Sequence, residues 1–256
     1  MTDDVRIIEI RDEREPIAEA ALAVIADMFA AHERQPISEL RSEIAERRLG
    51  MLSGYNFHLL TALYSGDDTP AGTIAGLYLD GVNAGFITYL AVRSQHRGRR
   101  LARLLRPRLI EVFRADARRE EYDDLAWVLG EVRADSPWLR RLVRTRGAIP
   151  FDIRYYHPGM SLDSDERYIL YRQPIGDHRL ELPVELVRRT LFAIYRRGYR
   201  VRYPLNRDIF SNMLQQLEGR DYIGVHPDYR ELVCNPPEPR MSAAPRTRPA
   251  PESSKP

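Results

Sequence analysis

Cysteine, lysine and long apolar runs are nearly absent from this chain of 256 residues. Its single cysteine, Cys234, excludes an intrachain disulfide and a cysteine-rich zinc cage. The histidines form no HxxxH or HExxH pair, so the sequence predicts no metal site. No apolar run approaches the roughly 20 residues that a membrane helix needs, and the opening residues do not resemble a signal peptide. We therefore expect a cytoplasmic protein without a membrane partner.

Arginine replaces lysine almost completely, since Lys255 is the only lysine among 39 basic residues. A GC-rich genome would produce this bias, and so would a need for planar guanidinium groups that bind phosphate and carboxylate. The net charge of +2 argues against a protein devoted to nucleic acid. Tyr195, Tyr199 and Tyr203 lie among arginines, a pattern found on surfaces that bind single strands. A solvated helix end explains it better, so we predict no specific nucleic-acid partner.

Composition divides the chain into three sections. Apolar residues make up 43% of the chain, enough for one large core. Seven of the 18 prolines fall within residues 236–256, which we expect to be a disordered tail. The periodicity predicts a main domain over 1–175 and a helical C-terminal extension over 176–235.

Hydrophobic periodicity predicts a mixture of strands and helices. The expected strands cover residues 5–10, 57–64, 73–79, 85–92, 125–132, 149–156 and 168–173. The expected helices cover residues 16–30, 38–49, 99–118, 137–147, 183–196 and 207–217, with Ser38, Ser136 and Asn206 as N-caps. Pro107 should bend its helix or cost about 3 kcal/mol. This order predicts a mixed α/β protein in which helices pack on one sheet.

The segment after the strand at 85–92 carries the clearest chemical signal. It reads Arg-Gly-Arg-Arg-Leu-Ala over 97–102 and leads directly into a helix. The first N–H groups of a helix have no partner within it and attract anions. Gly98 permits a close approach of the backbone, and the arginines add charged donors. The segment therefore predicts a site for a phosphate-bearing ligand.

Here the sequence resembles the GNAT superfamily of acyl-CoA-dependent N-acyltransferases. The family signature, V-x-x-x-x-R-G-x-G-x-G/A, is matched by Val92, Arg97, Gly98 and Ala102. Arg100 departs from it, because the family has a second glycine there. The order of elements over about residues 4–175 also resembles the family. The resemblance implies a mixed, mostly antiparallel sheet of about seven strands flanked by helices, followed here by a helical appendage.

The resemblance also implies an activity. The strands at 85–92 and 125–132 should splay apart and hold the pantetheine arm of acetyl-CoA, or a related acyl-CoA, with one backbone N–H polarising the thioester carbonyl. The implied binding residues are Leu90, Ala91, Val92, Arg97, Gly98, Arg99, Arg100, Leu101 and Ala102. The acceptor should be an amine on a small molecule or peptide, which attacks the thioester directly. A homodimer is a further expectation, and no metal is implied.

The acid and base are less completely specified. Glu131, in an apolar strand, is a candidate base, or else a structural partner for a neighbouring arginine. The family's usual acid tyrosine is absent, because Val143 occupies its position. Tyr155 or Tyr156 could replace it, and we select Tyr155, although the thiolate could also leave unaided. The rival hypothesis is a non-catalytic module that binds CoA or a protein partner.

Overall fold

Seven strands form one sheet in the order β1-β2-β3-β4-β5-β7-β6. The computed structural model describes residues 4–235. The strands are β1 (Val5–Ile10), β2 (Tyr55–Tyr64), β3 (Gly72–Leu79), β4 (Ala84–Val92), β5 (Trp127–Arg133), β6 (Ile149–Pro150) and β7 (Tyr168–Pro174). All neighbours are antiparallel except β4 and β5, which are parallel. The predicted mixed, mostly antiparallel sheet is confirmed.

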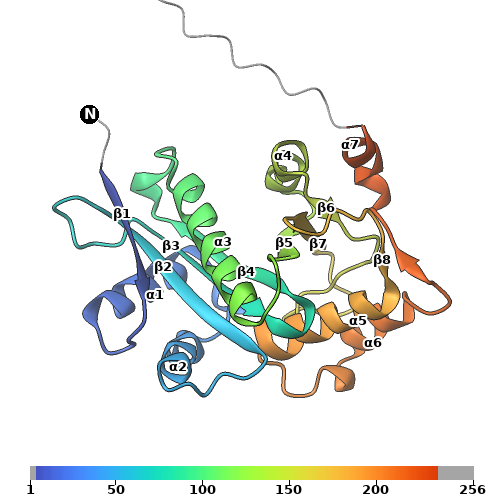
Figure 1. Ribbon diagram of the computed structural model, residues 1–256, viewed down its shortest axis with the longest axis horizontal. Coiled ribbons are helices and arrows are strands. Elements are labelled where there is room, and N and C mark those ends of the chain that lie inside the picture. The colour runs from blue at the N-terminus through green and yellow to red at the C-terminus, as the bar shows by residue number, and fades with distance from the viewer. Residues whose placement is uncertain (1–3, 236–256) are drawn as a thin grey trace, which may run out of the picture.

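Helices cover both faces of this sheet (Figure 1). They are α1 (Pro16–Met28), α2 (Ile37–Arg48), α3 (Leu101–Arg119), α4 (Pro137–Arg146), α5 (Val184–Ala193), α6 (Asp208–Gln215) and α7 (Arg230–Cys234). Leu59 packs in the core that holds α1 and α2, whereas its neighbour Leu60 packs in the core under α3. Successive side chains of a strand point to opposite faces of the sheet, so the same strand contributes residues to both cores. No helix within residues 4–235 is long and apolar enough to span a membrane.

Residues 152–156 differ from the prediction of a strand over 149–156. Only Ile149 and Pro150 pair with β7, and Tyr155 adds a single bridge to Tyr168. The Phe151 N–H still donates to Leu170 of β7, but the N–H groups of Asp152, Arg154 and Tyr156 donate to Gly224, Gln216 and Met213. Contacts with the C-terminal extension therefore take the place of sheet pairing.

Two of the three predicted helix caps are wrong by one or two positions. Pro36, not Ser38, is the N-cap of α2, and Arg207, not Asn206, is that of α6. Proline's fixed φ suits a helix start without any side-chain bond. Ser136 is confirmed, since its hydroxyl accepts the N–H of Trp138. The helix α3 continues past Pro107 without interruption.

The C-terminal extension, residues 176–235, shares the core under α1 and α2. Val187, Leu191 and Phe210 are buried there. Between α5 and α6 the chain makes a π-helical turn over Ile194–Gly198, and a short ribbon pairs β8 (Leu182–Pro183) with β9 (Tyr222–Ile223). The domain boundaries at 175 and 235 stay predictions, and the predicted tail over 236–256 lies outside the described residues.

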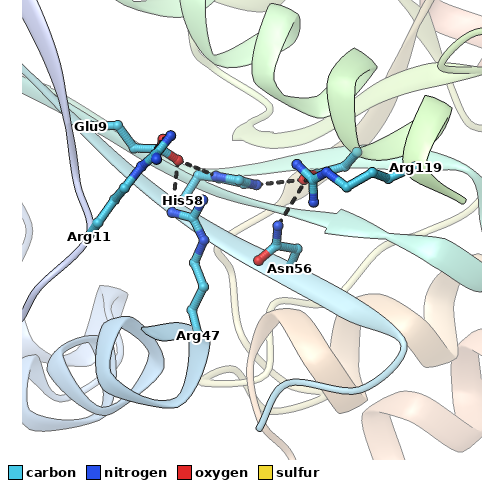
Figure 2. A network of polar contacts seen from close by, with 7 residues as sticks. Glu9, Arg11, Arg47, Asn56, His58 and Arg119 are labelled. Atoms are coloured by element: carbon cyan, nitrogen blue, oxygen red, sulfur yellow. Dashed lines mark hydrogen bonds and ion pairs between the residues drawn. The ribbon is translucent and has the colours of Figure 1, made fainter. Parts of the chain in front are cut away.

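A polar network crosses the sheet at β2 (Figure 2). The buried His58 places Nδ1 2.6 Å from Glu9 of β1 and Nε2 2.5 Å from Asp116 of α3. Arg47 of α2 lies 2.8 Å from Glu9, and Arg119 lies 2.6 Å from Asp116. The network therefore ties the edge strand β1 to α3, the helix that begins at the arginine-rich segment.

A second buried carboxyl, that of Glu43 in α2, carries a testable consequence. Both of its oxygens lack a hydrogen-bond partner among the described residues, and Arg200 Nε is 3.9 Å away. Burial raises the pKa of Glu43 to about 8, although Arg200 opposes the rise. A pKa raised in the folded state means that the free energy of unfolding falls as the pH rises from the unfolded value of 4.5 toward 8.

We therefore expect Glu43→Gln to stabilise the protein at pH 8. The gain should be on the order of 1–3 kcal/mol, because the amide needs no proton to stay neutral in the core. At pH 4 the variant should match the wild type. Urea unfolding at both pH values measures the effect, and a loss of stability at pH 8 would show that the ionised Glu43–Arg200 pair stabilises the fold.

Candidate active site

A cleft opens where β4 and β5 separate. The two strands pair only at Ala84–Phe86 against Trp127–Leu129. Just beyond, the register between β3 and β4 shifts, which leaves Thr88 as an extra residue whose hydroxyl donates to the Ala75 carbonyl at 3.1 Å. Such a bulge bends a strand. The cleft has a volume of about 530 Å³, and its walls include Leu90, Ala91 and Val92 of β4 together with Glu131 and Val132 of β5.

The segment from Val92 to α3 contains two residues with left-handed backbone conformation. Gly98 has φ +81°, and the space where a Cβ would lie is open. Arg100 is the N-cap of α3 and has φ +63°. A non-glycine residue in this left-handed region costs roughly 1–2 kcal/mol. Arg100 thus adopts a conformation that glycine favours, at the position where the signature has glycine.

A second cavity of about 620 Å³ continues from the cleft along α3 and α4. The two share the walls formed by Val92, Arg97, Ala102, Arg106 and Trp138. Six arginines line this outer cavity: Arg97, Arg100, Arg103, Arg106, Arg141 and Arg146. Guanidinium forks match phosphate oxygens in geometry and charge. The groove therefore has a more apolar inner end and a strongly basic outer end.

Arg106 stands in the wall between the two cavities. It is 6% exposed and has no carboxylate partner among the described residues, and its Nη2 has no hydrogen-bond partner there. Burial lowers the pKa of Arg106, which the neighbouring Tyr171 hydroxyl partly offsets. A buried cation without a counter-ion is costly. The Arg106 side chain nevertheless lines both cavities, so it adds a positive charge to the wall of the groove.

Glu131 lies at the inner end of the groove with its side chain 9% exposed. The Tyr199 hydroxyl donates to Oε1 at 2.6 Å, and His157 Nε2 is 3.6 Å from the same oxygen. Oε2 is buried and has no hydrogen-bond partner within residues 4–235. In that part of the chain the only ion-pair contact of Glu131 is with His157, so its neighbour is not an arginine.

Tyr155 and Tyr156 are both buried, but neither lines the groove. The Tyr155 ring packs edge-on against Tyr195, with centroids 6.5 Å apart. Burial and the nearby Glu131 carboxylate raise the pKa of Tyr155 well above its usual range, so the phenol stays protonated. The argument that only one of the pair enters the cleft assumed a strand, and these two residues lie outside any strand.

Several residues around Glu131 were missed by the sequence analysis. Tyr171, Trp138 and Ser136 line the cleft. Gly130 makes room for Tyr171, because a Cβ there would lie 2.5 Å from the tyrosine hydroxyl. The expectation of a solvated aromatic cluster is wrong for Tyr195, which is buried, and for Tyr199, which contacts Glu131. No local signal could reveal these contacts, which join positions far apart in sequence.

A family model described as "Acetyltransferase (GNAT) family" matches residues 23–136, which include the arginine-rich loop and Glu131. Over these residues the chain is similar to the GNAT family. The match ends before His157 and Tyr199, so both residues near Glu131 Oε1 come from outside it. Among the described residues of this chain, no group of three or more His, Cys, Asp or Glu side chains could hold a metal ion.

Solved GNAT structures share the fold. A GNAT-family protein from Bacteroides thetaiotaomicron matches at a TM-score of 0.53 and 15% identity, over 77% of this chain and 99% of that chain. One from Desulfovibrio desulfuricans matches at a TM-score of 0.50 and 16% identity, over 67% of this chain and 99% of that chain. A Salmonella typhimurium protein solved with acetyl-CoA as its cofactor matches at a TM-score of 0.46 and 17% identity, over 68% of this chain and 95% of that chain. This TM-score is too low to carry an argument. No curated protein sequence gives a significant match.

Proposed function

We propose that this protein transfers an acetyl or other short acyl group from acyl-CoA to a primary amine. The observation that carries the proposal is the continuous groove, with Glu131 at its inner end and six arginines at its outer end. This arrangement fits a long ligand with a reactive end and a phosphorylated end. Bound acyl-CoA would supply an activated thioester carbonyl.

The binding residues follow the groove. Leu90, Ala91 and Val92 line its inner part and would contact the pantetheine arm. The loop residues Arg97, Gly98, Arg99, Arg100, Leu101 and Ala102 would hold the phosphates through N–H groups of the helix start and guanidinium donors. Arg106, which lines both cavities, adds a positive charge to the wall of the groove.

Direct attack needs a base for the amine proton, and an acid can assist the departing sulfur. The amine nitrogen bonds to the thioester carbonyl carbon and the carbon–sulfur bond breaks, while Glu131 Oε2 accepts the proton that the amine loses. The departing sulfur takes a proton. Tyr171, which lines the cleft and whose pKa is raised by burial, is better located to donate it than Tyr155. Tyr155 stays a candidate, held protonated beside Glu131.

The acceptor is proposed as an amine on a small molecule or peptide. A homodimer and a cytoplasmic location remain predictions. The alternative, a non-catalytic module that binds CoA, is favoured by Arg100 and by the absence of the family's usual acid at Val143. Release of free thiol from acetyl-CoA with a panel of amines discriminates between the two, because only an enzyme releases it.

We expect Gly98→Val to weaken CoA binding at least tenfold. The substitution forces a β-branched residue into φ +81°, so the loop must change shape. Gly66→Val is a matched control, because Gly66 has φ +82° with equally open surroundings and is not among the groove-lining residues. Both variants should lose similar stability in thermal melts. Calorimetry that gives both the wild-type affinity for CoA would remove the basis of the proposed site.

A further inference from the structure

We infer that Tyr199, in the C-terminal extension, is a positioning residue that holds the Glu131 carboxylate for proton transfer. The inference rests on the proposed function of Glu131 as the base. It assigns a catalytic purpose to a segment beyond the family match at 23–136.

The contact between the two residues is short and well supported. The Tyr199 hydroxyl lies 2.6 Å from Glu131 Oε1. Its ring packs edge-on against His157, with centroids 4.8 Å apart, and against Phe86 of β4 at 5.8 Å. A phenol held by rings on two sides has few rotamers left, so its hydroxyl stays directed at the carboxylate.

The backbone before Tyr199 is built to bring it there. The π-helical turn over Ile194–Gly198 ends with the Tyr199 N–H donating to the Ile194 carbonyl at 3.0 Å. Such turns are rare and often mark functional sites. Gly198 permits the approach to β4, because a Cβ there would lie 3.0 Å from the Phe86 ring.

His157 lies beside the same oxygen. Its Nδ1 accepts the N–H of Gly159 at 3.1 Å, so a neutral ring carries its proton on Nε2. That nitrogen faces Oε1 from 3.6 Å. Tyr199 therefore donates to Oε1 with His157 close by, and Oε2 is the oxygen without a hydrogen-bond partner among the described residues.

The hydrogen bond from Tyr199 is also the one side-chain hydrogen bond that Glu131 makes within residues 4–235. A donor to an ionised carboxylate favours the charged form and lowers its pKa. The titratable groups whose charges act on Glu131 or lie beside it are His157, Tyr89, Tyr155, Tyr168, Tyr171, Tyr195 and Tyr199. Among these phenols, Tyr199 makes the 2.6 Å contact. Removal of its hydroxyl should therefore change the electrostatic environment of the Glu131 carboxylate most.

Tyr199→Phe tests the inference, because it removes the hydroxyl and keeps the ring packing. We expect kcat to fall roughly 10- to 100-fold with little change in the KM for acetyl-CoA. The acidic limb of the pH–rate profile should move to higher pH, since a carboxylate that loses a hydrogen-bond donor holds its proton more tightly. Tyr203→Phe is the control: that side chain is 59% exposed, and its variant should behave as wild type.

A readout independent of activity completes the test. Carbon-13 NMR of labelled glutamate, with the Glu131 signal assigned by its loss in Glu131→Gln, should give a higher Glu131 pKa in Tyr199→Phe. An unchanged pKa together with an unchanged rate profile would overturn the role of Tyr199. A raised pKa in a protein that releases no thiol with any amine would instead overturn the proposed enzyme, and with it the catalytic purpose of the contact.

Discussion

Glu131→Gln should reduce turnover by about 10²- to 10⁴-fold while acyl-CoA affinity stays close to that of the wild type. The amide keeps the size of the side chain and can still bond to Tyr199, but it cannot take a proton from the amine. The defect should shrink at high pH, where more of the amine is already neutral. Thiol-release assays across a range of pH measure turnover, and calorimetry measures the affinity for CoA.

The exposed Glu166→Gln serves as the control for this substitution. Glu166 lies 3.4 Å from Arg133 at the surface, outside the groove. Its loss should leave the rate unchanged. Full turnover at neutral pH in a folded Glu131→Gln variant would end its candidacy as the base and would direct attention to a bound water.

His58→Gln should lower the free energy of unfolding by about 3–5 kcal/mol, the usual cost of removing one member of a buried ion pair. His58 contacts Glu9 and Asp116 at once through its two ring nitrogens, so a single buried side chain bridges two carboxylates. The glutamine variant removes the bridge between Glu9 and Asp116, which then keep only their contacts with arginine and asparagine side chains. For a chain of this size the melting temperature should fall by roughly 10 °C, and His178→Gln, at an exposed position, should change it little.

The same network predicts how the difference in unfolding free energy between wild type and His58→Gln depends on pH. Burial by itself would raise the pKa of Glu9, but the bond from His58 and the charge of Arg47 outweigh it and hold the pKa well below its usual range. A lowered pKa stabilises the fold above the unfolded value of 4.5 and loses that effect as the pH falls. The gap between wild type and His58→Gln should therefore narrow in acid. A gap that widens below pH 4 would contradict this assignment.

The local sequence pattern was sufficient to predict most of the sheet, but it was insufficient to predict which residues surround Glu131. The strand at Val5–Ile10 and the helix between Ser136 and Gly147 are found where the sequence places them, because alternation and caps are read within a few residues. The segment at 152–156 has the apolar residues of a strand, yet its N–H groups bond to Gly224, Gln216 and Met213. Such partners, about 60 or more positions away, leave no mark on local periodicity.

Tyr199 shows the same limit of local sequence pattern within the candidate active site. Its arginine neighbours suggested a solvated segment, because composition reports the average environment of a stretch and not the direction of one side chain. The arginine-rich loop, in contrast, was recognisable, because a glycine between a strand and a helix is a local signal. The candidate base could be named from its own strand, but the groups that orient it could not.

The loss of pairing at 152–156 also determines which edge of the sheet is open to a second molecule. Strand β6 is only two residues long, and the chain beside it is occupied: Phe151 bridges to Val225, and the His226 N–H donates to the Pro150 carbonyl. Exposed strand edges are where two copies of a protein add to each other's sheets. At this edge the C-terminal extension already fills the position of a partner strand. A homodimer that extends the sheet would therefore have to join through β1.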